Sequence, residues 1–152
     1  DYAHMGHALD NVLTSLRGLC KGKLIVVFGA GGDRPPDRRT QMGRVAAQKA
    51  DFSVLTSDNP RSEDPLKILA TIETAFKAAG GKSYKVEPDR RAAISFALQN
   101  AGPGDVICIA GKGHETGQII GGKVLPFDDK AEAAAALREL EKKQGVDTIQ
   151  RT

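Results

Sequence analysis

The first apolar residues recur along the chain at the spacing of a helix. Between residues 8 and 20 they follow one another at intervals of three and four, which places them on one face of an amphipathic helix. This apolar stripe consists of Leu9, Val12, Leu13, Leu16 and Leu19. The next segment, KLIVVFG, has five consecutive apolar residues and ends in glycine. Such a run is typical of a strand that is buried on both faces of a parallel sheet.

The same alternation of helix and strand continues to the end of the chain. We predict helices at about 37–50, 65–79, 90–100 and 129–143, and strands in FSVLT, SYKVE and VICIAG. Asp64 and Asp89 stand where helix N-caps are expected, and Asp129 with Glu132 has the spacing of a capping box. QII and KVLPF flank Gly121-Gly122, which predicts a β-hairpin.

This pattern predicts one doubly wound α/β domain. Strand and helix alternate repeatedly, so we expect a mostly parallel sheet of about six strands with an antiparallel hairpin at one edge. The domain should span residues 1–144, and residues 145–152 should form a frayed tail. In such sheets, ligands bind beyond the carboxyl ends of the strands.

Composition narrows the function classes. The chain has 152 residues, 40% of them apolar, which is enough for the core of one domain. No apolar run approaches the roughly 20 residues that span a bilayer. Two cysteines are too few for a disulfide framework, and the net charge of +3 comes without a clustered basic face. We therefore expect a cytoplasmic domain that binds neither membranes nor nucleic acid.

Three loops leave the carboxyl ends of predicted strands: GAGGDRPPDRR, SDNPRSED and GKGHETG. The first begins like a dinucleotide fingerprint, but Arg34 stands where the third glycine is required, and no lysine lies in a P-loop motif. Two interpretations remain for this loop. Either its backbone amides meet an anion beside Arg34, or it is a tight turn with a solvated arginine.

The second and third loops carry more charge than a turn requires. Asp58, Asn59 and Pro60 are ordinary turn residues, whereas the guanidinium group of Arg61 is suited to a carboxylate or phosphate, unless it is merely solvated. The third loop places Lys112, His114 and Glu115 among glycines, without the ligand spacing of a metal site or an evident catalytic triad. Together the loops match a zwitterion such as an amino acid.

The order of several motifs resembles one family. DYAH, VVFGAGGDR, LTSDNPRSEDP, DRRAAI and DVICIAGKGHE occur in the order found in the C-terminal domain of the Mur ligases, from residue 1 to about residue 140. The resemblance implies a Rossmann-like fold and a role in a three-domain cytoplasmic enzyme of peptidoglycan synthesis. In that family ATP phosphorylates the D-glutamate carboxylate of UDP-MurNAc-L-Ala-D-Glu, and the amine of the added amino acid attacks the acyl phosphate.

The resemblance also implies roles for individual residues. The D-N-P-R loop, here Asp58 to Arg61, marks ligases that add meso-2,6-diaminopimelate, and Arg61 would pair with the carboxylate that lysine lacks. Arg34 would hold a ligand carboxylate, and Gly111 and Glu115 would receive an ammonium group. The residues expected near the nucleotide side of the cleft are Asp1, His4, Lys112 and His114. Met5, Gly6 and His7 replace the family's usual T-P-D beside them.

The resemblance assigns the remaining chemistry to other domains. The family has a UDP-sugar domain and a central ATPase domain, and neither is among these residues. The central domain is the main binding site of ATP and Mg²⁺. We therefore expect the chain alone to be inactive, and we assign it no catalytic residue and no metal ligand. A monomer is expected. Two alternatives stay open: a lysine- or ornithine-adding ligase of the same family, and a non-catalytic α/β module that binds a nucleotide or a protein partner.

Overall fold

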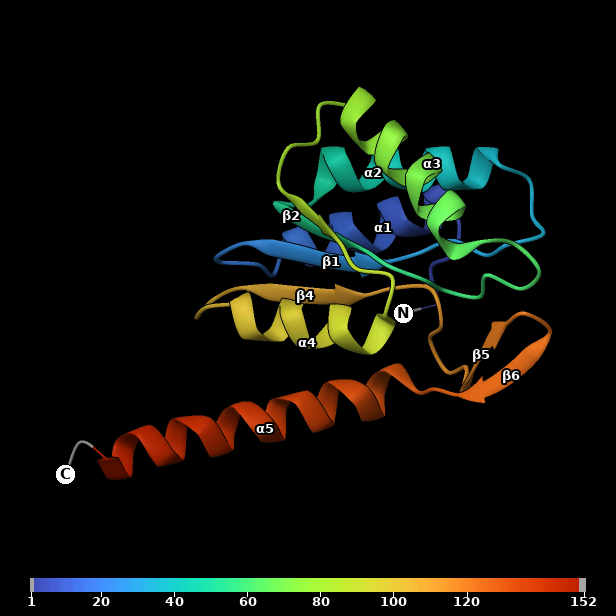
Figure 1. Cartoon of the computed structure of the whole chain (residues 1–152). Helices are drawn as coiled ribbons and strands as arrows, with labels where there is room; N and C mark the ends of the chain where they lie inside the picture. Colours follow the sequence, from blue (N-terminus) through green and yellow to red (C-terminus); the bar gives the residue numbers. More distant parts are fainter. Residues whose placement is uncertain (1, 151–152) are drawn as a thin grey trace.

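The described part of the chain is an α/β domain built on a parallel sheet (Figure 1). The computed structural model describes residues 2–150, with side chains described as far as residue 145. The elements are α1 (Gly6–Arg17), β1 (Leu24–Phe28), α2 (Asp37–Lys49), β2 (Phe52–Leu55), α3 (Pro65–Ala78), β3 (Tyr84–Val86), α4 (Arg90–Asn100), β4 (Val106–Ile109), β5 (Gly117–Ile120), β6 (Lys123–Pro126) and α5 (Asp129–Gln150). The predicted fold class is confirmed.

Strand β1 lies in the middle of the sheet. The strand order is β3-β2-β1-β4, all parallel, so β2 and β4 pair with β1 on its two sides. Every residue of β1 is buried, as the continuous apolar run predicted. The carboxyl ends of β2 and β4 therefore flank the carboxyl end of β1, where the loops of interest begin.

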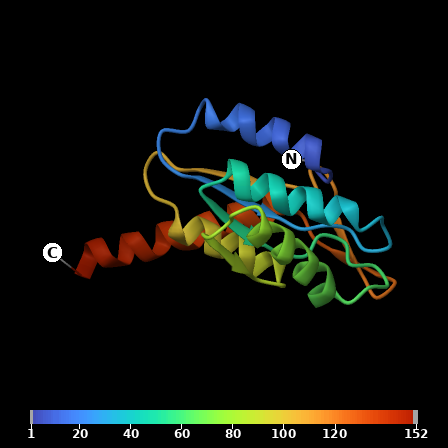
Figure 2. The ribbon, with the colours of Figure 1, turned by 90° about the horizontal axis from the view of Figure 1, so that it is seen from above.

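Helices cover both faces of the sheet. Helices α1, α2 and α3 lie side by side on one face, with α2 between the other two (Figure 2), and α4 covers the opposite face. Because successive side chains of a strand point to opposite faces, β1 contributes to both cores. Val26 and Phe28 pack in the cluster below α1, α2 and α3, whereas Ile25 and Val27 pack in the cluster with α4.

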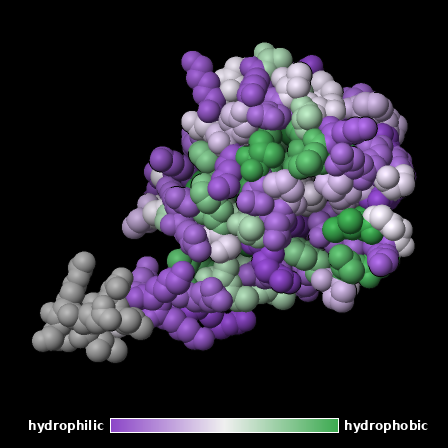
Figure 3. Space-filling model, viewed as in Figure 1, coloured by the Kyte–Doolittle hydropathy of each residue, from purple (hydrophilic) through white to green (hydrophobic). Residues whose placement is uncertain are grey.

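The prediction that the hairpin forms one edge of a sheet of about six strands is wrong. The parallel sheet has four strands, and β5 and β6 form a separate two-stranded sheet. Polar contacts hold it against the second and third loops. The Gln118 side chain donates to the Asp58 carbonyl of the second loop at 2.8 Å, and the Lys112 ammonium group of the third loop donates to the Gly117 carbonyl at 3.0 Å. Apolar side chains remain exposed at this end of the molecule (Figure 3), among them Val124 and Leu125.

Two of the three predicted helix caps are confirmed. Asp64 accepts from the Leu66 amide and Asp89 from the Arg91 amide, both at 2.9 Å. The capping box at Asp129 is wrong. The carboxylate of Asp128 caps α5 instead, at 3.1 Å from the Ala131 amide, because the carboxylate of Asp129 is bound by a buried arginine.

The last helix extends further than predicted. Helix α5 continues past residue 143 to Gln150, since that part of the sequence has no proline to stop it. Residues 151–152 of the expected frayed tail lie outside the described residues. No helix within the described part of the chain is long and apolar enough to cross a membrane.

Candidate functional site

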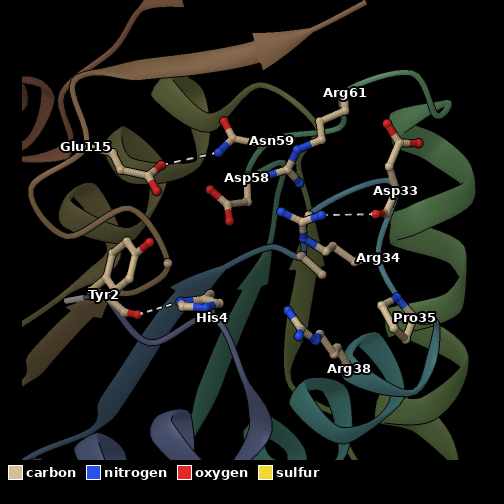
Figure 4. Close-up of a pocket in the computed structure, with 13 residues that line it drawn as sticks. Tyr2, His4, Asp33, Arg34, Pro35, Arg38, Asp58, Asn59, Arg61 and Glu115 are labelled. Carbon is tan, nitrogen blue, oxygen red and sulfur yellow. Dashed lines mark hydrogen bonds between the residues drawn. The ribbon is translucent and has the colours of Figure 1, made fainter.

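The three loops meet around one cavity at the carboxyl edge of the sheet (Figure 4). The cavity has a volume of about 470 Å³ and is lined from segments 2–4, 30–38, 58–61 and 111–115. This volume falls in the range of small-molecule sites. Of the residues that were predicted to bind the amino acid, the lining includes Arg34, Asp58, Asn59, Arg61, Gly111 and Glu115.

The glycines of the first loop allow the second loop to lie directly on it. A Cβ atom at Gly29 would overlap the Thr56 carbonyl, and one at Gly32 would overlap the Pro60 carbonyl. The Gly32 amide donates to the Asn59 carbonyl at 2.8 Å. Of the two interpretations of this loop, anion binding by a backbone amide does not hold for Gly32, because its N–H group is used inside the protein.

Arg61 is held in an unusual backbone conformation. Its φ of 55° lies in the left-handed region, which is unfavourable for a side chain of this size. Backbone bonds to the hairpin hold it there, since its amide donates to the Ile119 carbonyl at 3.0 Å and its carbonyl accepts from the Gly121 amide at 2.8 Å. Its guanidinium group donates to the Gly32 carbonyl at 2.9 Å and lines the cavity.

Asp33 and Arg34 form the adjoining wall of the cavity. Asp33 also has a positive φ, 54°, and its carboxylate accepts from the Ser62 hydroxyl at 2.6 Å. This hydrogen bond, supported by the Ser62 amide, lowers the pKa of Asp33 below its usual value of 3.8. Arg34 is exposed, and its guanidinium group points into the same part of the cavity as that of Arg61 (Figure 4).

Lys112 lies behind the cavity wall rather than in it. Its side chain is fully buried, and its ammonium group lies 2.9 Å from Asn59 Oδ1, 3.0 Å from the Gly117 carbonyl and 3.2 Å from Asp58 Oδ1. A buried ammonium group needs such partners, because desolvation is otherwise costly. Lys112 therefore supports the wall and does not face the cleft, where we had expected it.

The same lysine fixes the orientation of the Asn59 amide. Asn59 Oδ1 accepts from both Lys112 and the Ile119 amide, the latter at 3.0 Å. The NH₂ end of the amide must then point the other way, where it donates to Glu115 Oε2 at 3.2 Å. Asn59 thus links the second loop to the third and holds one carboxylate at the cavity.

The other expected residues lie in different surroundings. His4 lines the cavity, and its Nδ1 donates to the Tyr2 carbonyl at 3.0 Å. His114 is exposed and stacks on the Tyr2 ring, with centroids 5.4 Å apart. Pro60 is buried and does not line the cavity. Asp1 lies outside the described residues.

Some residues that line the cavity were not predicted from the sequence. Tyr2, Asp33 and Arg38 also line the cavity. Asp33 could have been found from its place beside Arg34, whereas Arg38 lies in a helix that looked merely basic. With Arg38 included, three arginines and three acidic residues, Asp33, Asp58 and Glu115, line the cavity, which suits a ligand with both kinds of charge. Among the described residues, no cluster of three His, Cys, Asp or Glu side chains could hold a metal ion.

The fold and the cavity together define a parallel α/β domain with a cavity at the carboxyl edge of its sheet, lined by side chains of both charges. A comparison with protein families places the chain more closely. The model of the family "Mur ligase, glutamate ligase domain" matches residues 1–113, and the chain belongs to this family.

Similar proteins are ligases much longer than this chain. The chain is 51% identical over 139 residues to the UDP-N-acetylmuramoyl-L-alanyl-D-glutamate--2,6-diaminopimelate ligase of Geobacillus kaustophilus, covering 91% of the chain and 28% of that protein. It is 51% identical over 137 residues to the ligase of the same name from Coxiella burnetii, covering 90% and 28%. A solved structure of such a ligase superimposes with a TM-score of 0.87 at 41% identity, covering 93% of this chain and 29% of that one. The chain thus spans less than a third of these relatives.

Proposed function

We propose that the chain is the amino-acid-binding domain of the ligase that adds meso-2,6-diaminopimelate to UDP-MurNAc-L-Ala-D-Glu in peptidoglycan biosynthesis. The names of its similar relatives support this assignment. The observation that carries it is the placement of the Arg34 and Arg61 guanidinium groups opposite the carboxylates of Asp58 and Glu115 around one cavity (Figure 4).

The charges of the cavity match those of diaminopimelate. This amino acid has two carboxylates and two ammonium groups, whereas lysine lacks the second carboxylate. Arg61 and Arg34 supply planar, bidentate donors for carboxylates. Asp58 and Glu115 supply acceptors for an ammonium group, and Asn59 holds Glu115 in place. Arg61 is then the residue that distinguishes diaminopimelate from lysine.

The role of this chain in the reaction is to hold the nucleophile. ATP transfers its terminal phosphoryl group to the D-glutamate carboxylate, which gives ADP and an acyl phosphate. An ammonium group of the amino acid held in the cavity loses a proton, and the resulting amine attacks the acyl carbon and displaces phosphate. Positioning the amine lowers the entropic part of the barrier, and domain closure brings it to the carbonyl. ATP and Mg²⁺ are held mainly by the central domain of the complete ligase, which acts as a cytoplasmic monomer.

Calorimetric titration of the chain with meso-diaminopimelate tests the assignment, with L-lysine as the competing ligand. We expect selective binding of diaminopimelate. Arg61→Ala should weaken it by about 2–5 kcal/mol, because the ligand carboxylate loses its charged partner. Arg44→Ala is the matched control, since Arg44 is exposed and lies outside the cavity.

Equal affinity for lysine and diaminopimelate would favour a lysine- or ornithine-adding ligase. Diaminopimelate binding that is unchanged in Arg61→Ala would show that Arg61 does not recognise the ligand. Binding of a nucleotide, without any amino acid, would favour a non-catalytic module.

A further inference from the structure

Arg90 is the largest side chain of the domain to be almost completely buried, with 1% of its surface exposed. It is the first residue of α4, in the DRRAAI segment, and lies outside the cavity lining. A positive charge at a helix N-terminus is unfavourable, because the helix dipole is positive there. A buried charge is also costly unless it is paired and hydrogen-bonded. Both costs must be offset by what Arg90 contacts.

One partner of Arg90 is a carboxylate from the last helix. Nε of Arg90 donates to Asp129 Oδ1 and Nη2 donates to Asp129 Oδ2, both at 2.7 Å. This is the bidentate geometry in which guanidinium and carboxylate bind most strongly. The pair neutralises the buried charge and fixes the plane of the guanidinium group.

The remaining N–H groups reach the two loops that form the cavity. Nη1 donates to the Ser57 carbonyl at 3.2 Å, and Nη2 donates to the Ala110 carbonyl at 3.0 Å. Each carbonyl belongs to the residue just before a cavity segment, since Asp58 follows Ser57 and Gly111 follows Ala110. One side chain therefore binds the carboxyl ends of β2 and β4, the strands on either side of β1.

We propose that Arg90 is a positioning residue, which with Asp129 sets the distance and angle between the second and third loops and so the width of the cavity. The second loop carries Asp58 and Arg61, and the third carries Glu115. Both loops are otherwise joined by polar contacts of side chains at their tips, such as Asn59 with Glu115. Arg90 holds them at their base, where a small rotation would move the lining groups of both loops.

A neighbouring ion pair provides the matched control. Arg91 binds Glu132 with the same kind of bidentate geometry, at 2.7 and 2.9 Å, and also joins α4 to α5. Its side chain is 67% exposed, and among the described residues its guanidinium group donates to Glu132 alone. If joining the helices were the whole role of Arg90, substitutions at the two arginines would have effects of the same kind.

The test is residue-resolved amide hydrogen exchange by NMR, on ligand-free wild type, Arg90→Lys and Arg91→Lys. Lysine keeps the charge beside Asp129, but one ammonium group cannot reach the carboxylate and both carbonyls in this geometry. We expect the Arg61 and Glu115 amides of Arg90→Lys to exchange about tenfold faster or more, with Val27 in β1 unchanged, because only the loops open locally. Arg91→Lys should exchange like wild type at all three sites.

Asp129→Asn is the second variant, because it leaves Arg90 intact and removes only the charge that orients it. It should accelerate the same loop amides to a smaller extent. Loop amides that exchange as in wild type in both variants would overturn the proposal, as would equal acceleration of loops and β1, which indicates a purely structural role.

A second measurement connects this inference to the ligand and rests on the proposed function. Arg90→Lys should weaken meso-diaminopimelate binding about tenfold, while Arg91→Lys leaves it unchanged. If wild type does not bind diaminopimelate, the proposed function fails, and the exchange pattern still decides whether Arg90 positions the loops. If wild type binds and Arg90→Lys binds equally well, the positioning role fails.

Discussion

The ammonium group of Lys112 has acceptors from two parts of the chain, the second loop and the first strand of the hairpin. It donates to Asn59 and to Gly117, and it lies 3.2 Å from the Asp58 carboxylate. Because the side chain is fully buried, no water can replace these bonds when the ammonium group is removed. At the scale of one residue, Lys112 is therefore the part of the site whose loss should cost most stability.

We expect Lys112→Met to lower the free energy of unfolding by about 3–5 kcal/mol, since it leaves Asp58 without its buried partner. Urea unfolding followed by circular dichroism measures this change. Lys67→Met is the control, because Lys67 is exposed on α3, and it should change the free energy by no more than about 0.5 kcal/mol. Similar values for the two variants would mean that the buried ammonium group contributes no net stability.

Asp33 leads to a prediction about pH. Its pKa is lowered, mainly by the Ser62 hydroxyl, so the ionised form is favoured in the folded state and stabilises it above the unfolded value of 3.8. This contribution is lost as the pH falls through the still lower pKa of the folded protein. Asn tolerates the positive φ equally well, so Asp33→Asn isolates the charge.

The difference in urea midpoint between wild type and Asp33→Asn should accordingly be constant from pH 7 to about pH 5 and shrink below pH 3.8. Carboxylates common to both proteins cancel in this difference. A difference that stays constant down to pH 2.5 would show that the Ser62 hydrogen bond does not depend on ionisation.

At the scale of the element, the contact between the first two loops depends on glycine. A Cβ atom at Gly29 would overlap the Thr56 carbonyl, which is backbone and cannot move aside without displacing β2. Gly145 lies within α5 and has open space around it. The same substitution should therefore have opposite signs at the two positions.

Gly29→Ala should lower the free energy of unfolding by at least about 2 kcal/mol through backbone strain, whereas Gly145→Ala should raise it by about 0.5–1 kcal/mol through helix propensity. Thermal and urea unfolding of the two variants check both signs. A neutral Gly29→Ala would mean that the loops separate easily, contrary to the close packing described above.

Elements could be predicted from the sequence where they depend on near neighbours. The buried run of β1 and the caps at Asp64 and Asp89 are set by residues within a turn or a strand. The capping box at Asp129 failed because its carboxylate is taken by Arg90, 39 residues away in the chain. Lys112 was expected to face the cleft for a similar reason: the direction of its side chain depends on the hairpin carbonyl that it binds, which no local pattern indicates.

At the scale of the whole molecule, β1 joins two cores into one. Val26 packs with α1, α2 and α3, and Val27 packs with α4 on the opposite face. Both side chains are completely buried. Because adjacent residues of one strand belong to different clusters, neither cluster can loosen without displacing a strand that the other cluster needs.

We therefore expect Val26→Ala and Val27→Ala to destabilise the whole domain rather than one face of it. Each removes the equivalent of two buried methylene groups, which corresponds to about 2 kcal/mol. In both variants, methyl NMR signals of Leu69, in the first cluster, and Ile94, in the second, should disappear at the same urea concentration, lower than in wild type. Earlier loss of Leu69 in Val26→Ala, or of Ile94 in Val27→Ala, would show that the two faces unfold separately.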